Sequence, residues 1–305
     1  MKLILNGQQA FGKAALEKIL QAGTDEVVGV FTAPDKDGRP PDPVKQAAIE
    51  HGLPLFQPAS YKDEATLETM RSLDADLMVM AYVIIFIPEA ARDVPKMGSI
   101  CFHPSLLPLH RGPSSINWPI MWGASKTGFS WFYPTDGLDE GDILIQREVD
   151  IGPDETLGDV YFKKIFPAGV DSVLDVVDAF RAGNPPRTVQ DHSKATYESW
   201  CKKSDVELDW SRQAADVYNM IRAGNPQPGA WTTVGGNEVQ IYDSARIDGD
   251  GAAGEVVAVS DDGVTVQASG GRILIKRVRP KGGDKVAASE WAAAAGVAAG
   301  TKFGA

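Results

Sequence analysis

The chain has 305 residues, of which 43% are hydrophobic and 23% charged, enough for one large or two ordinary globular domains. Its net charge is −11: 18 basic and 28 acidic residues precede residue 201, and 12 basic and 13 acidic residues follow. This balance argues against a broad nucleic-acid-binding surface, although a local basic patch stays open.

Only two cysteines are present, Cys101 and Cys201, and their spacing predicts neither a disulfide framework nor a zinc site. We therefore expect a reducing, cytoplasmic compartment. The N-terminus lacks the long apolar core of a secretory signal. The longest apolar run, residues 77–87, has about half the length that spans a bilayer, so no membrane segment is expected.

The first half of the chain alternates between strands and helices. Apolar runs of strand length lie at 2–6, 26–32, 54–56, 75–82 and 99–102, and helices are expected at 11–20, 43–51, 64–73 and 88–92. This alternation predicts a mostly parallel, Rossmann-like α/β sheet with helices on both faces. Two further strands, in 128–135 and 142–151, flank an acidic turn, and one long helix is expected at 156–182.

The C-terminal part has a different pattern. A helix is expected at 214–223, and several short strands with Gly and Asp turns follow between 230 and 279. That pattern is typical of a small, OB-like β-barrel. We therefore predict a catalytic α/β domain at 1–182, a linker at 183–204 and a C-terminal β-barrel domain at 205–305.

The segment GQQAFGKA, residues 7–14, joins the first strand to the first helix. Gly12 and Lys13 match part of a phosphate loop, but Ala14 stands where a Mg²⁺-binding hydroxyl belongs. The dinucleotide fingerprint is also incomplete, because Gln9 replaces its second glycine. A glycine-permitted turn and an anion site both remain open.

The segment ICFHPSLLPLHRG, residues 100–112, holds two of the four histidines. His103 stands where a buried parallel strand ends, at the sheet edge where open α/β folds bind ligands. A functional histidine and a hydrogen-bonded structural one are both compatible with this position. No two histidines have the short spacing of a metal site, and we expect His51 and His192 at the surface.

The segment TDGLDEGD, residues 135–142, places four acids in one short turn: Asp136, Asp139, Glu140 and Asp142. One interpretation is a solvated hairpin loop. The other is a carboxylate presented to His103, which would favour and orient the imidazolium. The sequence does not choose among the four acids.

These segments together resemble the folate-dependent formyltransferase family. The resemblance is carried by the segment HPSLLPLHRGPSSINW and by the acidic turn TDGLDEGD that follows it. It extends over nearly the whole chain through three further segments, ATYESWCKKSDVELDW, IRAGNPQPGAWT and IKRVRPKGGDKVAASEW. Among members of the family, the chain is most similar to the hydrolase domain of 10-formyltetrahydrofolate dehydrogenase. It also resembles methionyl-tRNA formyltransferase.

The resemblance implies a formyltransferase fold and assigns roles by position. His103 matches the catalytic histidine of the family and Asp139 its catalytic aspartate. The implied folate contacts come from three segments: Ile85, Phe86 and Ile87; Ser105, Leu106, Leu107 and Pro108; and Gly137 and Leu138. The implied substrate-cofactor is 10-formyltetrahydrofolate or tetrahydrofolate, with no metal and no NAD.

Cys101 departs from the family pattern, because formyl-transferring members carry Asn two residues before the histidine. A thiol is a weak hydrogen-bond donor, and the loss of one oxyanion donor typically costs on the order of 10²–10³ in rate. The hydrolase domain of the dehydrogenase also lacks the Asn. A covalent role for Cys101 is a further interpretation, although nothing nearby in sequence indicates a lowered pKa.

Residues 33–46 help to separate the possible formyl acceptors. Methionyl-tRNA formyltransferases carry a longer, basic loop here, whereas this loop has only Lys36, Arg39 and Lys45 and resembles the PDKDG segment of the dehydrogenase. We read the late basic run, Arg277, Arg279, Lys281 and Lys285, as a solvated face. The expected partner is a small-molecule folate, and tRNA is disfavoured.

The leading hypothesis is removal of the formyl group from 10-formyltetrahydrofolate, by hydrolysis or by transfer to a small acceptor. Methionyl-tRNA formyltransferase is the first alternative. Formyl transfer to an amino sugar or another amine, and a catalytically weak folate-binding protein, are the others. The sequence does not indicate an oligomeric state.

Overall fold

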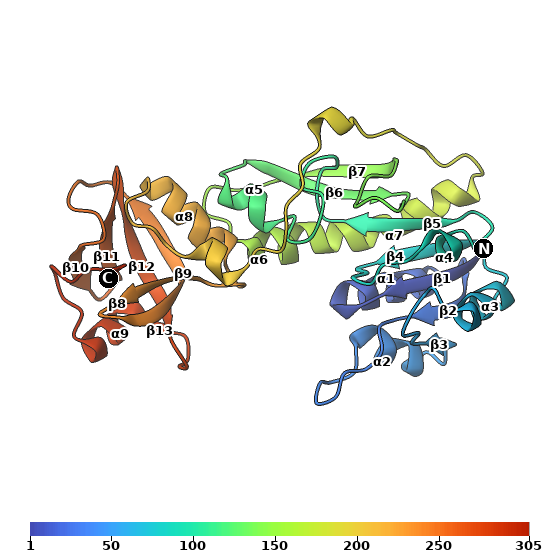
Figure 1. Cartoon of the computed structure of the whole chain (residues 1–305), viewed down its shortest axis with the longest axis horizontal. Coiled ribbons are helices and arrows are strands. Elements are labelled where there is room, and N and C mark those ends of the chain that lie inside the picture. The colour runs from blue at the N-terminus through green and yellow to red at the C-terminus, as the bar shows by residue number, and fades with distance from the viewer. Residues whose placement is uncertain (305) are drawn as a thin grey trace. The chain divides into compact units, whose positions relative to one another are not determined.

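A computed structural model describes residues 1–304, so residue 305 of the predicted C-terminal domain lies outside the described part. The chain forms two compact units (Figure 1). The α/β unit comprises residues 1–111, 128–149 and 164–197, and the C-terminal unit comprises 112–127, 150–163 and the chain from 198 on. Each unit thus draws on several chain segments, and the domain limits predicted at 182 and 205 stay predictions.

The α/β unit is built on a seven-stranded sheet with the order β3-β2-β1-β4-β5-β6-β7. The ladders β1–β2, β1–β4, β2–β3 and β4–β5 are parallel, and β5–β6 is antiparallel. The predicted, mostly parallel sheet is therefore confirmed. The strands are β1 (Lys2–Gly7), β2 (Glu26–Phe31), β3 (Leu55–Phe56), β4 (Leu77–Ala81), β5 (Ser99–His103), β6 (Lys126–Phe132) and β7 (Ile143–Asp150).

Helices cover this sheet because its central strands are apolar on both faces, as in other parallel sheets. All five residues of β4 are buried, as are the last five of β1. Helix α1 packs against both α2 and α7. The helices before β5 are α1 (Gln9–Ala22), α2 (Pro43–Glu50), α3 (Glu64–Ser72) and α4 (Glu89–Arg92).

The prediction of one continuous helix at 156–182 is wrong, because this region is divided into three helical segments. It consists of α6 (Leu157–Val160), a π-helical turn η1 (Tyr161–Ile165) and α7 (Phe166–Arg181). Pro167 at the start of α7 explains the interruption, because its ring lacks an N–H and collides with the carbonyl four residues earlier. The preceding turn widens to the π pattern instead.

The turn between β1 and α1 is built for close packing. A Cβ on Gly7 would lie 2.5 Å from the Ala81 carbonyl oxygen, and one on Gly12 would lie 2.8 Å from Val44. The first helical N–H, that of Gln9, already donates to the Asp42 carboxylate at 3.1 Å. This geometry supports the glycine-permitted turn rather than an anion site.

The C-terminal unit contains a six-stranded sheet in which the ladders β10–β11, β11–β12, β12–β9, β8–β9 and β12–β13 are antiparallel. Its order is β10-β11-β12-β9-β8, which confirms the small C-terminal β-domain that the sequence pattern predicts. The strands are β8 (Ala230–Val234), β9 (Asn237–Ile247), β10 (Val256–Ser260), β11 (Gly263–Ala268), β12 (Gly271–Pro280) and β13 (Val286–Ala287). Besides α6, the helices of this unit are α5 (Asn117–Met121), η3 (Lys203–Val206), α8 (Ala214–Ala223) and α9 (Ala288–Ala295).

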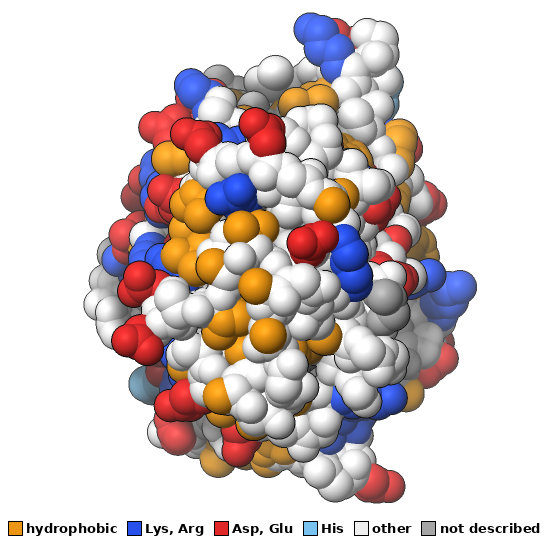
Figure 2. All heavy atoms as spheres, turned by 90° about the vertical axis from the view of Figure 1, so that its left-hand side faces the viewer, with side chains coloured by type: hydrophobic (Ala, Val, Ile, Leu, Met, Phe, Trp, Pro, Cys, Tyr) orange, Lys and Arg blue, Asp and Glu red, His pale blue; other side chains and the backbone are white. Residues whose placement is uncertain are grey.

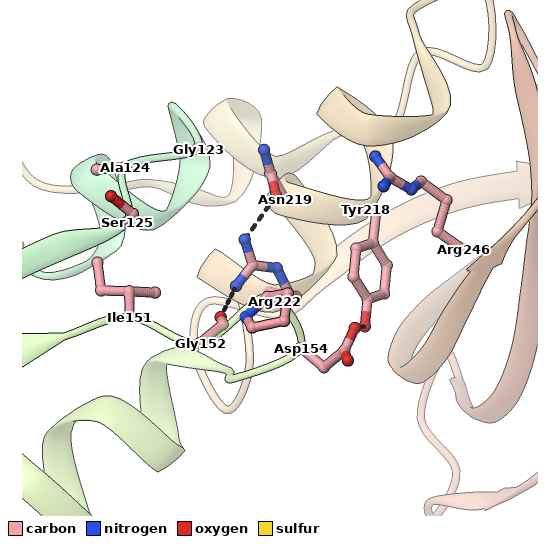
Figure 3. A pocket seen from close by; sticks show the side chains of 11 residues that line it. Gly123, Ala124, Ser125, Ile151, Gly152, Asp154, Tyr218, Asn219, Arg222 and Arg246 are labelled. Carbon is pink, nitrogen blue, oxygen red and sulfur yellow. Dashed lines mark hydrogen bonds between the residues drawn. The ribbon is translucent and has the colours of Figure 1, made fainter.

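A hollow of about 400 Å³ lies in the C-terminal unit, between residues 123–125, residues 151–154 and α8 (Figure 3). Arg222 reaches from α8 and donates to the carbonyls of Gly152 and Glu155 at 3.2 and 2.8 Å. Tyr218 donates to Asp154 at 2.8 Å, and burial raises the pKa of this phenol to about 12. These bonds hold residues 152–155 against α8, which explains why that segment belongs to the C-terminal unit.

The face of the C-terminal unit drawn in Figure 2 shows acidic and basic side chains interspersed around apolar ones. No continuous basic surface is visible there, in agreement with the near-balanced charge of this part. Within residues 1–304, no helix is both long and apolar enough to cross a membrane.

Candidate active site

His103 ends β5 and is 7% exposed. Pro104 follows it and has no N–H to extend the ladder of hydrogen bonds, so the chain turns at once into residues 105–108, the SLLP loop. The Nε2 atom of His103 lies 2.8 Å from the carbonyl oxygen of His110. Because a carbonyl oxygen only accepts, this hydrogen bond requires a proton on Nε2 and turns Nδ1 in the opposite direction.

Asp139 is the acid that faces His103. The distance between its Oδ2 and the Nδ1 of His103 is 3.6 Å, which is within ion-pair range but too long for a hydrogen bond. The other three acids of the turn have different partners: Asp136 pairs with Arg92 at 2.8 Å, Glu140 with Arg111 at 3.7 Å and Asp142 with Arg187 at 3.4 Å. The structure thus places opposite His103 the acid that the family resemblance assigned and that the local pattern of the turn left open.

Cys101 lies on the same strand and packs against the small apolar cluster of Leu107, Phe132 and Ile143. Its thiol lies 3.7 Å from the carbonyl oxygen of Phe102. Burial, followed by the negative charge of Asp139, raises the pKa of this thiol. Cys101 therefore stays protonated at neutral pH, which argues against the covalent interpretation.

The SLLP loop is held from beneath by Ser130. Its hydroxyl donates to the Ser105 carbonyl at 2.8 Å and accepts from the Leu107 N–H at 3.3 Å. The side chains of Ser105 and Leu107 are buried, whereas Leu106 and Pro108 are half-buried. Ser105 and Leu107 can therefore shape the loop from inside, and the half-buried pair offers more surface to a ligand.

The remaining predicted contact residues differ in exposure. Phe86 and Leu138 are 57% and 52% exposed, Ile85 is half-buried, and Ile87 is buried. Gly137 is exposed, and a Cβ there would collide with the Glu140 carboxylate. These placements leave the assigned folate contacts as predictions.

Sequence reasoning did not identify the three residues that hold the acidic turn. Arg92, which is 5% exposed, donates to the Ile87 carbonyl at 2.6 Å and to Asp136. On the other side, Gln190 donates to two carbonyls of the turn, and Arg111 forms an ion pair with Glu140. Arg111 lies in the same segment as His103 and His110, which the sequence singles out. Gln190 lies in the predicted linker, where no sequence motif indicates a function.

Among residues 1–304, no three His, Cys, Asp or Glu side chains converge in a way that could hold a metal ion. His51 and His192 are both exposed, and His192 lies 3.2 Å from Arg111 through its Nδ1.

Residues 1–169 match the family described as Formyl transferase, and residues 201–296 match the formyl transferase C-terminal domain. The chain belongs to the formyl transferase family. It is 36% identical over 306 residues to the mitochondrial 10-formyltetrahydrofolate dehydrogenase of Mus musculus, which covers 95% of this chain and 33% of that protein. The chain thus spans about a third of the length of the dehydrogenases that it matches.

A second relative matches this chain from end to end. Methionyl-tRNA formyltransferase of Geotalea uraniireducens is 33% identical over 309 residues, covering 100% of this chain and 98% of that enzyme. Among solved structures, HypX of Aquifex aeolicus in complex with tetrahydrofolic acid superposes with a TM-score of 0.68 at 20% identity. It covers 95% of this chain and 46% of HypX. This likeness shows a shared fold, and the family match over residues 1–169 confirms that it is the formyltransferase fold.

Proposed function

We propose that this enzyme binds 10-formyltetrahydrofolate and removes its formyl group, to water or to a small acceptor, with His103 and Asp139 as the catalytic pair. The observation that carries the proposal is the pairing itself. In a formyl transferase family chain, one acid of four stands 3.6 Å from the histidine at the end of β5.

The chemistry follows from acyl transfer. Water attacks the formyl carbon, and negative charge develops on the formyl oxygen. The C–N10 bond then breaks, N10 takes a proton, and formate and tetrahydrofolate leave. His103 donates a hydrogen bond or a proton to the oxygen or to N10, and the charge of Asp139 stabilises the imidazolium or accepts the proton of the water.

Cys101 supports hydrolysis rather than formyl transfer to an amine. Its thiol is a weak donor, and its nearest acceptor is the Phe102 carbonyl. The site thus lacks the amide donor that the resemblance associates with formyl transfer. The 36% identity to a 10-formyltetrahydrofolate dehydrogenase over 95% of the chain agrees with this view.

Methionyl-tRNA formyltransferase is the second candidate, favoured by the end-to-end match to the Geotalea enzyme. One assay separates the two. The purified protein is incubated with 10-formyltetrahydrofolate, and tetrahydrofolate and formate are followed with and without Met-tRNA. We expect turnover without tRNA. Turnover that strictly requires Met-tRNA would contradict the proposal, and tight folate binding without any turnover would favour a binding protein.

A further inference from the structure

Two buried side chains outside the catalytic pair connect to both of its members. Arg111 is fully buried, and Gln190 is 3% exposed. Arg111 donates from Nε and Nη2 to the Gln190 side-chain oxygen, at 3.2 and 2.8 Å. The Gln190 amide in turn donates to the carbonyls of Asp139 and Gly141, at 2.9 and 2.6 Å.

The backbone of Asp139 needs such support. Its φ is +54°, in the left-handed region where residues other than glycine are uncommon. A conformation of this kind is strained and persists only where the surroundings impose it. The two hydrogen bonds from Gln190 hold the carbonyl of this residue and the carbonyl two residues later, that of Gly141, in place.

The same network reaches His103 through the backbone. His110, whose carbonyl accepts from the His103 ring, directly precedes Arg111. The position of this segment is reinforced by hydrogen bonds from the backbone N–H groups of His110 and Arg111 to Thr196. Arg111 thus follows directly after His110, which holds the His103 ring, and its side chain also holds Gln190, which supports Asp139.

Arg111 itself is held on its outer side. Its Nη1 atom donates to the Tyr197 hydroxyl, which donates to the Glu140 carboxylate at 2.7 Å. Glu140 therefore compensates the buried charge and belongs to the same turn as Asp139. A buried guanidinium with this many directed bonds keeps its position.

We propose that Arg111 and Gln190 are positioning residues that set the separation of His103 and Asp139. The inference rests on the proposed function for its kinetic consequence. Replacement of Gln190 by Leu approximately keeps the side-chain volume but removes both amide donors. The carbonyls of Asp139 and Gly141 then lose these hydrogen bonds. A shift of about 1 Å between reacting groups can cost on the order of 10²-fold in rate.

The chain supplies a matched control in its C-terminal unit. Gln267 is 1% exposed, donates to the carbonyls of Ala268 and Gly271 at 2.8 Å each, and accepts from Arg272 Nε at 2.9 Å. Gln267→Leu thus removes the same kind of buried glutamine from the other unit. It reports the general cost of the substitution without touching the acidic turn.

The experiment compares wild type, Gln190→Leu and Gln267→Leu in turnover of 10-formyltetrahydrofolate and in amide hydrogen exchange. We expect kcat to fall on the order of 10²-fold for Gln190→Leu alone, with KM nearly unchanged. Exchange in residues 136–142 should accelerate in that variant and stay at the wild-type rate in Gln267→Leu. Normal kcat in folded Gln190→Leu, or unchanged exchange in the turn, would overturn the inference.

A double-mutant cycle with Asp139→Asn shows whether Gln190 acts through the aspartate. If it does, Gln190→Leu lowers kcat little further in the Asp139→Asn background. Multiplication of the two effects would mean that Gln190 acts elsewhere and would refute the assignment. If Gln190→Leu does not fold, Tyr197→Phe serves as the milder variant, with a smaller loss of kcat and faster exchange in the turn expected.

Failure of the proposed function is a distinct result. It would appear as wild-type protein that does not consume 10-formyltetrahydrofolate under any condition. The hydrogen-exchange comparison then still decides whether Gln190 holds the turn.

Discussion

At the scale of single residues, the 3.6 Å between His103 Nδ1 and Asp139 Oδ2 defines an electrostatic pair rather than a hydrogen-bonded one. The His110 carbonyl keeps the ring fixed from the opposite side. Catalytic contacts of this kind often shorten only when substrate is bound. The pair therefore has the orientation that the proposed chemistry needs before any substrate arrives.

His103→Ala tests this pair. The variant loses the group that stabilises the developing oxyanion or protonates N10, so we expect kcat to fall by about 10²–10⁴ while tetrahydrofolate still binds. His51→Ala is the matched control, because His51 is an exposed histidine of the same unit. Single-turnover rates and equilibrium folate binding provide the measurements. A near-normal rate in His103→Ala would remove the residue from the mechanism.

Cys101→Asn tests the departure from the family pattern. An amide at this position supplies a stronger donor to the oxyanion than a thiol does. We expect the variant to raise formyl transfer to an added amine relative to hydrolysis, measured as formylated amine against formate. Cys201→Asn, at the half-buried cysteine of the other unit, is the control. An unchanged ratio in Cys101→Asn would mean that the donor does not select the acceptor.

At the scale of elements, the helical region after β7 depends on a capping box at its start. Asp159 accepts from the Thr156 N–H and hydroxyl, at 3.0 and 2.7 Å, and pairs with Lys163 at 2.6 Å. Lys163 first, and then the Thr156 donors, hold the pKa of this carboxyl at about 2. A capped start compensates for the interruption that Pro167 causes further along.

Asp159→Asn is predicted to have a pH-dependent effect. A lowered pKa stabilises the folded state above the unfolded-state pKa of about 3.9, and that contribution disappears as pH falls toward 2. We expect the variant to unfold about 1–3 °C below wild type at pH 6, because the pair is partly exposed. In thermal scans, the difference in unfolding temperature between the variant and wild type should disappear between pH 4 and pH 2. Asp261→Asn, in an exposed turn, should show no such trend.

At the scale of the whole molecule, the net charge of −11 and the interspersed charges of Figure 2 disfavour a large polyanion as partner. The basic run on β12 and in the turn after it is the main exception. Arg277, Arg279 and Lys285 are exposed, and Lys285 also lies over the Tyr242 ring. No ion pair with an acid forms at these three residues in the described part of the chain.

Neutralising this run distinguishes the acceptors. The triple variant Arg277→Gln, Arg279→Gln and Lys285→Gln should leave turnover of 10-formyltetrahydrofolate within about twofold of wild type if the acceptor is water or small, since surface changes rarely disturb the fold. A Met-tRNA acceptor predicts instead a loss of activity relative to wild type that is largest at low salt and shrinks as salt is added. The assay is repeated with Arg212→Gln as a single surface control.

The sequence by itself determined the alternation of strands and helices, the antiparallel C-terminal sheet, and the residues worth testing. These features follow from local patterns, such as buried runs, turn residues and the order HPSLLP then GLDEGD, each of which is contained within a few positions of the chain. The formyl transferase family match agrees with them.

Local sequence pattern left open which of the four acids faces His103, and only the family resemblance pointed to Asp139. The tertiary structure decided that this acid faces the ring, and what holds it there. Asp136, Asp139, Glu140 and Asp142 are equivalent in sequence, and they separate because Arg92, Arg111 and Arg187 reach the turn from distant parts of the chain. Gln190 contacts Asp139 across 51 positions, a separation at which no local pattern carries information. A side chain's role in this site is set by what the fold places beside it, and that depends on packing between segments rather than on the segments themselves.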